Sequence, residues 1–484
     1  MKIYKLIVFA LIFGGVFTSC SDDLDDAVDN IVDGRDLTVE NFIYRALNEF
    51  YLYKADVPEL ADNYFASQAD RNDFLDNYAT PKDLFYDGLT ASQDRFSFLI
   101  DDYIKLENML SGKSTTPGMD YGLSVYPNDN TKVLGYVRYV LPNTSAAENG
   151  VERGMIFNRI NGEHLTRNNY ETLIASPNLT IGLARIESGE NVVDLDQSIA
   201  LTQAEYTENP VYITKTLDVD GEKVGYLMYN SFTRDFDPEL NAAFAWFKAE
   251  DIKNLVLDLR YNGGGNIETA SDLASMITGQ LEGKIFAKQH WNEKYQRIFE
   301  EENPQYLLNL FNNKIWNGEN INSLNLNKLY VIATGSSASA SELVINGLKA
   351  HIDVVHVGTT TVGKFQGSIP VYDSPNFQRD SPRLNTTHTY AMLPLVLTLV
   401  NADGVGGYTS GLTPDVKVIE YLNEFAPLGD PSEPLLSAAL DHISGNRRSY
   451  NTEESPFKII SESGAGNLDF QKMYIDKIPA VIEK

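Results

Sequence analysis

The sequence is poor in cysteine and in basic residues. Its 484 residues include one cysteine, Cys20, so an intramolecular disulfide is excluded. Acidic residues outnumber Lys and Arg by 67 to 39, and the net charge of -28 argues against a nucleic-acid partner, because nothing would neutralise the phosphates. The acidic balance by itself indicates only a well-solvated surface. With 43% hydrophobic and 22% charged residues, the chain has the composition of an ordinary globular protein with ample core.

The N-terminus lacks an apolar run long enough to span a bilayer, which requires about 20 residues. Instead, Lys2 and Lys5 precede a shorter apolar stretch over residues 6–17, which is typical of a secretory signal peptide over residues 1–19. Cys20 follows small residues at the end of this stretch, an arrangement that resembles a bacterial lipobox. The resemblance implies a lipidated Cys20 at the mature N-terminus. The alternative is a plain signal peptide with an incidental cysteine.

An acidic segment follows the cysteine. Residues 21–26 read Ser-Asp-Asp-Leu-Asp-Asp, and residues 20–36 are predicted to form a lipidated tether. The acidic tract resembles the export tags of surface lipoproteins in some Gram-negative bacteria, while the alternative is a simple disordered spacer. We therefore expect a lipid-anchored protein of a Gram-negative cell envelope, on the outer membrane and facing the periplasm or the surface. It would contact the membrane only through its lipid.

The rest of the chain divides by pattern into four regions. Residues 37–112 carry apolar residues four and three apart, which predicts a small helical domain. Residues 113–205 change to short strands and turns, with an Asn-Gly hairpin signal. Residues 206–425 alternate apolar strands with helices, which predicts an α/β core, and residues 426–484 hold a C-terminal helix and tail. The predicted fold is a multidomain protein of mixed α+β and α/β class.

The core pattern is specific enough to place its main elements. Buried strands are predicted over residues 224–229, 255–259, 329–333 and 354–358, and helices over residues 238–248, 268–278 and 341–350. Three motifs rich in small residues follow strands of this core, where the ligands and catalytic groups of α/β sheets collect.

The first motif is a glycine turn. Residues 258–266 read Asp-Leu-Arg-Tyr-Asn-Gly-Gly-Gly-Asn, directly after a strand and before a helix. Three glycines allow the backbone to turn sharply and to present N–H groups to an anion. Alone, the motif is compatible with a tight turn, a phosphate site or an oxyanion site.

The second motif is a serine-rich turn. Residues 335–342 read Gly-Ser-Ser-Ala-Ser-Ala-Ser-Glu, between a predicted strand and a predicted helix. A serine at a helix N-terminus is suited to nucleophilic catalysis, because free N–H groups there stabilise a developing oxyanion. Helix capping is the alternative, since serines before helices are usually caps, and Ser341 followed by Glu342 fits an ordinary cap.

The third motif contains a lysine. Residues 358–364 read Gly-Thr-Thr-Thr-Val-Gly-Lys and fit the spacing of a phosphate-binding P-loop. That motif requires Ser or Thr next, to bind Mg²⁺, but Phe365 follows, and Gly367 and Pro370 oppose the helix that a P-loop lysine would open. Nucleotide binding is therefore disfavoured, and Lys364 is left for another role.

Together the three motifs resemble the C-terminal processing peptidases of family S41. In that family a T/S-A-S-A-S-E block holds the nucleophile as its third residue and a Gly-Lys block follows. Ser339 and Lys364 are 25 positions apart, which is the spacing of the family. The glycine turn also matches, and residues 411–415 resemble the motif that closes the family's core. The resemblance covers most of residues 80–445 and implies a protease core related to ClpP and crotonase.

The resemblance also implies a mechanism. Ser339 would be the nucleophile and Lys364 the general base, since Ser-Lys pairs are a variant of the catalytic triad. Lysine normally holds its proton until about pH 10.4, so burial or nearby positive potential must lower its pKa. The backbone N–H groups of Gly264 and Ala340 would hold the oxyanion. An acyl-enzyme would form and water would release it, with no metal or other cofactor.

A third catalytic residue is less clearly marked. The family usually places a glutamine four positions after the lysine to orient it, but Ser368 occupies that position here. The nearest glutamine is Gln366, which becomes the candidate, with Ser368 as the alternative. A related branch of the family uses a Ser-His arrangement, but none of the six histidines falls in a matching motif.

The predicted β-rich region resembles a PDZ domain. The matching residues are a loop containing Gly122, Leu123 and Ser124, the block at residues 145–154, and the Ile-Asn-Gly turn at residues 160–162. PDZ domains bind extended peptide ends by adding a strand and holding the carboxylate with backbone N–H groups. The resemblance implies that the loop binds peptide; a closed groove is the alternative.

The predicted function is that of a serine endopeptidase that cleaves envelope proteins or peptides near their C-termini. Its expected partners are protein or peptide substrates, and the sequence predicts no oligomeric state. Two other functions remain open: a catalytically weak or inactive peptide-binding envelope lipoprotein with the same fold, and a hydrolase of non-peptide esters or amides.

Overall fold

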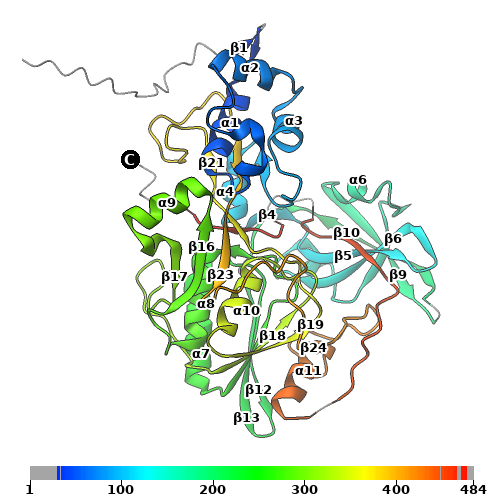
Figure 1. Cartoon of the computed structure of the whole chain (residues 1–484). Coiled ribbons are helices and arrows are strands. Elements are labelled where there is room, and N and C mark those ends of the chain that lie inside the picture. The colour runs from blue at the N-terminus through cyan, green and yellow to red at the C-terminus, as the bar shows by residue number, and fades with distance from the viewer. Residues whose placement is uncertain (1–29, 33, 189, 447, 466–469, 477–484) are drawn as a thin grey trace, which may run out of the picture.

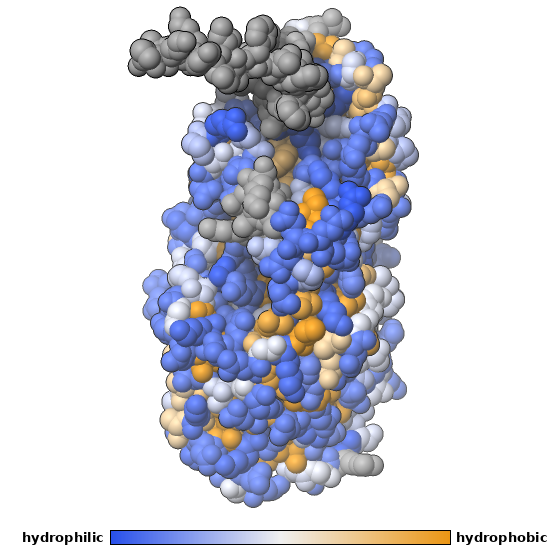
Figure 2. Space-filling view, turned by 60° about the vertical axis from the view of Figure 1, so that its left-hand side comes forward, coloured by the Kyte–Doolittle hydropathy of each residue, from blue (hydrophilic) through white to orange (hydrophobic). Residues whose placement is uncertain are grey.

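The computed structural model describes residues 30–32, 34–188, 190–446, 448–465 and 470–476. The predicted signal peptide, the lipidation site Cys20 and most of the predicted tether lie outside the described residues. Within these ranges, every helix is too short or too polar to cross a membrane. On the face that Figure 2 shows, hydrophilic residues predominate and hydrophobic residues form scattered patches, in keeping with the acidic composition.

The N-terminal helices stand at one end of the molecule (Figure 1). The main helix, α1 (Thr38–Phe50), buries Phe42, Ala46 and Phe50, so the predicted helical spacing is confirmed. Shorter elements complete this region: β1 (Ile31–Val32), β2 (Arg35–Asp36), α2 (Gln68–Asp76), α3 (Pro81–Asp83), β3 (Phe98–Ile100) and α4 (Tyr103–Leu110). The region is tied to the core, because β3 pairs with β22 (Ala391–Leu393), which in turn pairs with β21 (Val371–Tyr372).

A β-rich domain projects from one side of the molecule (Figure 1). Its sheet has the order β10-β9-β7-β6-β5-β25, with β8 paired to β7. Asn161 and Gly162, both at positive φ, form the predicted hairpin turn between β7 and β8. The elements are β5 (Met119–Tyr126), β6 (Asp129–Val140), α5 (Ser145–Glu148), β7 (Ile156–Ile160), β8 (Glu163–His164), α6 (Tyr170–Ile174), β9 (Asn178–Ile186), β10 (Val192–Thr202) and β25 (Ile459–Glu462).

The predicted loop at Gly122, Leu123 and Ser124 is instead the middle of strand β5, so the expectation of a loop is wrong. The resemblance to a PDZ domain predicts a loop here, around Gly122. In the structure this glycine makes room for an aromatic ring: a Cβ on Gly122 would lie 2.2 Å from Cζ of Tyr136 on the neighbouring strand. Whether these residues bind peptide remains a prediction.

The core contains a largely parallel sheet of order β12-β13-β14-β18-β19-β24, in which all neighbours from β13 onward are parallel. The predicted strands and helices of the core are confirmed. The strands are β12 (Val211–Val219), β13 (Glu222–Tyr229), β14 (Asn254–Asp258), β18 (Lys328–Ala333), β19 (Asp353–Gly358) and β24 (Val416–Lys417). The helices are α7 (Asp237–Glu250), α8 (Ile267–Thr278), α10 (Ala340–Lys349) and α11 (Pro434–Ile443).

Alternate residues of these strands serve two different cores. Leu227, Leu257 and Val331 join the large cluster that includes residues of α7, α8 and α10. Tyr226 and Ile332, which point the other way, pack with residues of α11. The sheet is therefore covered on both faces, as expected for parallel strands.

A second sheet of the core has the order β15-β26-β20-β23-β16-β17. Its strands are β15 (Gly265–Asn266), β16 (Ile285–Trp291), β17 (Leu308–Leu310), β20 (Gln366–Ser368), β23 (Leu395–Asn401) and β26 (Met473–Tyr474). Helix α9 (Glu293–Glu302) follows β16, and a separate pair joins β4 (Lys113–Thr116) to β11 (Ala204–Thr207). Strand β26 comes from the C-terminal end of the chain and lies between β15 and β20, parallel to both.

Candidate active site

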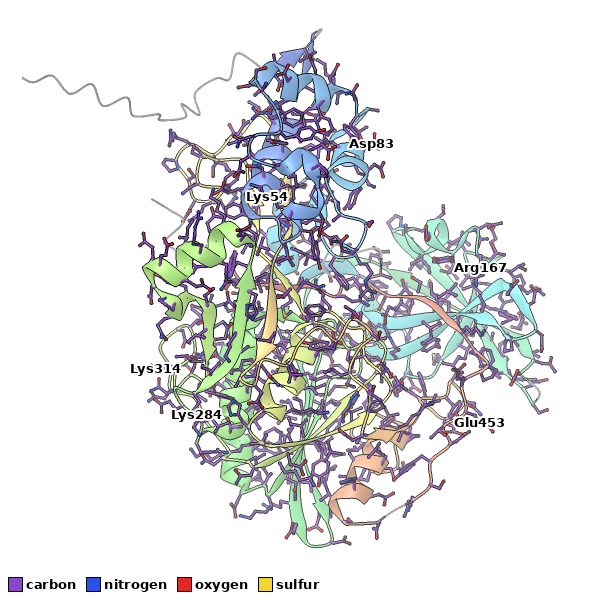
Figure 3. All side chains as sticks on the ribbon, in the orientation of Figure 1. Lys54, Asp83, Arg167, Lys284, Lys314 and Glu453 are labelled. Carbon is purple, nitrogen blue, oxygen red and sulfur yellow. The ribbon has the colours of Figure 1, made fainter. Side chains whose placement is uncertain are left out.

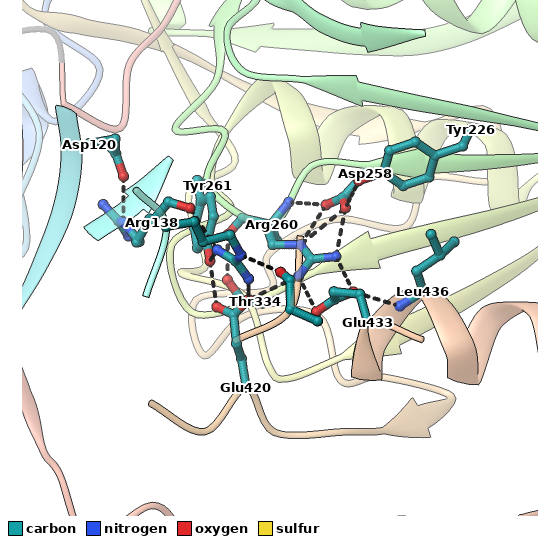
Figure 4. A network of polar contacts seen from close by, with 12 residues as sticks. Asp120, Arg138, Tyr226, Asp258, Arg260, Tyr261, Thr334, Glu420, Glu433 and Leu436 are labelled. Atoms are coloured by element: carbon teal, nitrogen blue, oxygen red, sulfur yellow. Dashed lines mark hydrogen bonds and ion pairs between the residues drawn. The ribbon is translucent and has the colours of Figure 1, made fainter. Parts of the chain in front are cut away.

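A largely buried ion-pair network supports the glycine turn. Asp258 ends β14, and Arg260 follows it with no exposed surface. The Arg260 guanidinium binds Asp258, Glu433 and Glu420, and Glu433 also caps α11 by accepting from the N–H of Leu436 at 2.9 Å (Figure 4). Burial alone would lower the pKa of Arg260, but the neighbouring carboxylates Asp258 and Glu433 hold it well above its ordinary value. The protein can bury this positive charge because carboxylates pair with it.

The glycine turn brings the chain against the serine-rich turn. The amide of Asn262 fixes it: Nδ2 donates to the carbonyl of Tyr229 at 2.8 Å, and Oδ1 accepts from the N–H of Gly264 at 2.8 Å. Gly264 and Gly265 have φ of 108° and 142°, which only glycine adopts without strain. A Cβ on Gly264 would lie 2.9 Å from Oγ of Ser339, so a side chain there would fill the space beside that hydroxyl.

The two predicted oxyanion donors flank this space. Ala340 is the first residue of α10, where N–H groups have no partner within the helix. The N–H of Gly264 points to Asn262 in this conformation, so it is engaged inside its own turn. The assignment of both groups to an oxyanion hole remains a prediction.

Ser339 differs from the serines around it. Its φ of 66° and ψ of -116° place it in a strained region for a residue with a side chain, and it is completely buried. Its Oγ has no hydrogen-bond partner among the described residues. By contrast, Ser337 donates to the carbonyl of Leu259 at 2.7 Å, and Ser341 donates to that of Asn262 at 2.9 Å. The neighbours are structural, and Ser339 is the serine left available for chemistry.

Glu342 connects the serine-rich turn to the lysine motif. Its buried carboxylate accepts from the N–H groups of Ser339 at 2.8 Å, Gly363 at 2.7 Å and Lys364 at 2.8 Å, and from the hydroxyl of Thr361. Burial raises the pKa of Glu342, and these hydrogen bonds oppose the shift. One side chain thereby fixes the spacing of the two predicted catalytic residues. The sequence marked Glu342 only as part of a helix cap, and it gave no sign of the contact with the lysine motif.

Lys364 is a buried amine that forms no ion pair with any carboxylate in the part of the chain that the structure describes. It is 2% exposed, and burial lowers its pKa to about 7, with Lys472 adding to the effect and Asp94 and Glu342 opposing it. Its Nζ lies 4.7 Å from the ring centroid of Phe96 in the N-terminal region. The amine donates to the carbonyl oxygen of Gln471 at 2.7 Å. Among the described residues it forms no hydrogen bond with Ser339.

The predicted third catalytic residue points elsewhere. The side chain of Gln366 donates to the hydroxyl of Tyr53 at 3.1 Å, and none of its hydrogen bonds in the described chain reaches Lys364. Its catalytic role, and that of the alternative Ser368 on the same strand, remain predictions. His356, on β19 beside the lysine motif, contacts the carbonyl of Ala333 instead of the predicted dyad.

A cavity of about 540 Å³ adjoins the glycine turn. Its walls include β5 of the β-rich domain, the turn at Gly263 and Gly264, and the C-terminal residues 461–464 and 470–472. Among the residues that the structure describes, no group of three or more His, Cys, Asp or Glu side chains is placed to hold a metal ion. The arrangement thus combines a buried serine, a buried amine of lowered pKa and a cavity beside the glycine turn.

Comparison with known families agrees with this arrangement. Residues 223–390 match peptidase family S41, and residues 38–98 match the peptidase S41 N-terminal domain. These two stretches are therefore similar to S41 peptidases, which agrees with the resemblance seen in the sequence. The sequence had predicted the N-terminal region only as a helical domain of unspecified kind.

Known relatives are distant in sequence. The carboxyl-terminal-processing protease of Picosynechococcus is 25% identical over 303 residues, which cover 61% of this chain and 66% of the relative. The carboxy-terminal processing protease of Bartonella bacilliformis is 24% identical, over 70% of this chain and 69% of the relative. A processing protease of Bacillus subtilis is 26% identical, over 37% of this chain and 34% of its own length. The chain thus spans between a third and about two thirds of the length of these relatives.

Solved structures share the fold. A crystal structure described as a candidate S41 protease from Bacteroides fragilis superposes with a TM-score of 0.65 and 25% identity, covering 83% of this chain and 97% of the other. The photosystem II D1 C-terminal processing protease superposes with a TM-score of 0.50 and 18% identity, covering 84% and 98%. The mixed α/β multidomain fold is therefore that of S41 proteases.

Proposed function

We propose that this protein is a serine endopeptidase in which Ser339 is the nucleophile and Lys364 the general base. One observation carries the proposal: a buried serine with a strained backbone and an unpartnered hydroxyl is tied, through Glu342, to a buried lysine whose pKa is lowered to about 7. Perturbed groups of this kind collect at catalytic sites.

The chemistry follows from these groups. Neutral Lys364 takes the hydroxyl proton of Ser339 as Oγ attacks the scissile carbonyl, and a lysine with a pKa near neutrality is largely able to do so at physiological pH. The oxyanion that forms is stabilised by N–H groups at the start of α10 and in the glycine turn. Lys364 then protonates the departing amine, which leaves an ester on Ser339. Water, deprotonated by Lys364, hydrolyses this ester and releases the new C-terminus.

The β-rich domain is proposed to be a PDZ-like module that receives the substrate. Its antiparallel sheet of short strands supports strand addition on the side of β5 away from β6, and strand addition is the mode by which such modules bind extended peptides. The names of the relatives, all carboxyl-terminal processing proteases, support cleavage of proteins or peptides near their C-termini. Envelope proteins are the proposed substrates.

The envelope location is a separate proposal that rests on residues 1–36 alone. Lipidation of Cys20 after removal of residues 1–19 would anchor the protein to the outer membrane. Labelled palmitate should be incorporated into the chain expressed in a Gram-negative host and should be lost in Cys20→Ser. Equal labelling of both proteins would contradict the anchor and leave the catalytic proposal intact.

Cleavage of an unfolded protein tests the proposed function. The parent chain is compared with Ser339→Ala, Lys364→Ala and the exposed-lysine control Lys105→Ala. Cleavage by the parent and the control, with loss in the two site variants, is the expected result. Equal cleavage by all four would contradict the dyad. Hydrolysis of a small ester but of no protein would favour the esterase alternative, and peptide binding without any turnover would favour the inactive lipoprotein.

A further inference from the structure

The C-terminal end of the chain reaches both places that the proposed function assigns to substrate. We call residues 458–465 and 470–476 the tail segment. The first stretch contains β25 and lies in the β-rich domain; the second contains β26 and lies in the core. In Figure 1 the tail segment is the red part of the chain, which runs from the vicinity of α11 along the β-rich domain and returns to the core.

The first stretch occupies the edge of β5. Strand β25 runs antiparallel to β5, with Ile459 opposite Ser124 and Glu462 opposite Gly122. The N–H of Val125 donates to the carbonyl of Lys458 at 3.1 Å, and the N–H of Ser463 donates to that of Tyr121 at 2.8 Å. The tail segment thus makes the main-chain contacts that an added peptide strand would make.

A side chain of the same stretch is held at the junction of the domain and the catalytic loop. The carboxylate of Glu462 pairs with Arg138 on β6, and it also accepts from the hydroxyl of Ser336 at 2.7 Å. Ser336 stands three residues before Ser339 in the serine-rich turn. Arg138 is 3% exposed, and its guanidinium lies 4.6 Å from the ring centroid of Tyr261. A buried arginine therefore binds an acidic side chain of the added strand.

The second stretch lies between the glycine turn and the strand that follows the lysine motif. Strand β26 pairs Met473 with Gly265 of the glycine turn and Tyr474 with Ser368 after the lysine motif. A Cβ on Gly264 would meet the carbonyl oxygen of Lys472 at 2.5 Å, on the side where it would also meet Ser339. At the far end, Asp476 is held by Arg234 and by Asn266, whose Nδ2 donates to it at 2.7 Å.

This placement leaves the dyad closed and separated. Ser339 is 0% exposed and Lys364 is 2% exposed, so a protein substrate cannot reach either while the tail segment is in place. The carbonyl of Gln471 takes the hydrogen bond of the Lys364 amine, which is the base that Ser339 requires. The hydroxyl of Ser339 in turn has no hydrogen-bond partner among the described residues, because the lysine amine is engaged elsewhere. The bound strand presents its carbonyl to the base instead of to the nucleophile.

We propose that the tail segment is a tethered pseudosubstrate that occupies the strand-addition edge of β5 and the catalytic cleft and holds Lys364 away from Ser339. The proposal rests on the proposed peptidase function. Activity then begins when an extended peptide replaces β25 on β5, and a peptide with an acidic side chain placed for Arg138 replaces it best. Because the Gln471 carbonyl is held by Lys364, the tail segment itself is not cut.

Charge reversal at the two anchors tests the proposal. The release variant carries Glu462→Lys, which opposes Arg138, and Asp476→Lys, which opposes Arg234. The matched control is Glu453→Lys, an exposed residue on the outer side of the chain before β25 (Figure 3). Cleavage of an unfolded protein should rise at least about tenfold in the release variant, because one charge-assisted contact corresponds to roughly a tenfold change in an equilibrium constant. The control should match the parent.

A binding measurement separates this inference from the proposed function. Each form is also made with Ser339→Ala, and fluorescence anisotropy follows a labelled synthetic peptide of residues 458–476. The release form should bind the peptide at least about tenfold more tightly than the parent and control forms, with similar unfolding temperatures throughout. A peptide carrying Glu462→Gln should bind more weakly.

The outcomes are distinct. Tighter peptide binding without any protein cleavage would support the occupied edge while contradicting the peptidase. Equal cleavage and equal peptide binding by the release and parent forms would overturn the tethered pseudosubstrate. So would an intact-mass measurement showing that active parent protein cuts its own chain between Gln471 and Met473.

Discussion

Two buried cations of the core have opposite surroundings. Arg260 has no exposed surface and is bound by Asp258, Glu433 and Glu420, which hold its pKa well above the ordinary value despite burial. Lys364 is 2% exposed and touches an aromatic ring and a backbone carbonyl, and burial lowers its pKa to about 7. Both residues follow strands of the same α/β core.

The difference separates a structural charge from a chemical one. A paired guanidinium keeps its proton. It joins the end of β14 to α11 and thereby holds in place the strand end from which the glycine turn begins. An unpaired amine gives up its proton near neutral pH and becomes a base. The strained, unpartnered Ser339 belongs with the second kind of site.

Replacing the unpaired lysine should abolish catalysis. Lys364→Met keeps the apolar stem and removes the base, so protein cleavage should fall by about 10³-fold or more, as when one member of a catalytic set is lost. The measurement is kcat/KM in the release variant, with Lys105→Met as the control. Retention of more than a tenth of the activity would exclude Lys364 as the base.

Replacing the paired arginine should instead lower the stability of the protein. Arg260→Met leaves Asp258 and Glu433 buried without their partner, which should lower the free energy of unfolding by about 3–5 kcal/mol. Urea denaturation measures the change. The control is Arg185→Met, which removes an exposed pair with Glu187 and should cost about 0–1 kcal/mol. Similar losses in the two variants would contradict the structural role of the Arg260 network.

The same lysine substitution should raise stability. The pKa of Lys364 is lowered in the folded protein, so the unfolded chain binds more protons between about pH 7 and the ordinary lysine pKa of 10.5. Lys364 therefore destabilises the folded protein, and this destabilisation is greatest at pH 7 and below. Lys364→Met removes it, so the variant should be more stable than the parent at pH 7. The advantage should shrink as pH rises towards 10. A variant less stable than the parent at pH 7 would show that the lysine is paired after all.

Glu342 should matter through position rather than through contact with substrate. Glu342→Gln keeps the size but replaces one acceptor oxygen by a donor. Loss of Oε2 breaks the contacts with the N–H groups of Ser339 and Lys364, and loss of Oε1 breaks those with Gly363 and Thr361. A fall in kcat of about tenfold to a hundredfold is expected from the loss of one or two charge-assisted hydrogen bonds. KM should stay nearly constant, and Glu342→Asp should recover part of the rate. A change confined to unfolding temperature would indicate a capping role alone.

The pH dependence of cleavage gives the smallest effect. Only neutral Lys364 accepts the proton, so kcat/KM should rise about tenfold per pH unit below a midpoint near 7 and level off above it. A profile measured on the release variant between pH 5 and 9 tests this, with unfolding followed over the same range as control. A rate that still climbs between pH 8 and 9 would mean that the lysine keeps its ordinary pKa.

Much of the core could be predicted from the sequence because local signals there agree. The apolar runs that became β13, β14, β18 and β19 have strand length, and helix-length segments separate them. The serine-rich turn and the lysine motif follow two of these strands, so their proximity could be expected from parallel topology alone.

Other features depend on contacts between distant parts of the chain. The bridge made by Glu342 spans 22 positions to Lys364, and a Ser-x-x-Glu pattern indicates only a helix cap. Gly122 interrupts an apolar pattern, and only the ring of Tyr136 explains it. Strands β25 and β26 are short pieces whose pairing with β5 and β20 spans hundreds of residues, so nothing in the tail's own sequence predicts where it lies.

The central claim is that Lys364 is a buried amine that loses its proton near neutral pH. NMR of the protein labelled with ¹³C at lysine Cε, with the signal assigned by its absence in Lys364→Met, measures this directly. The expected result is one lysine signal that titrates with a midpoint near 7. A midpoint above 10 for Lys364 would contradict it.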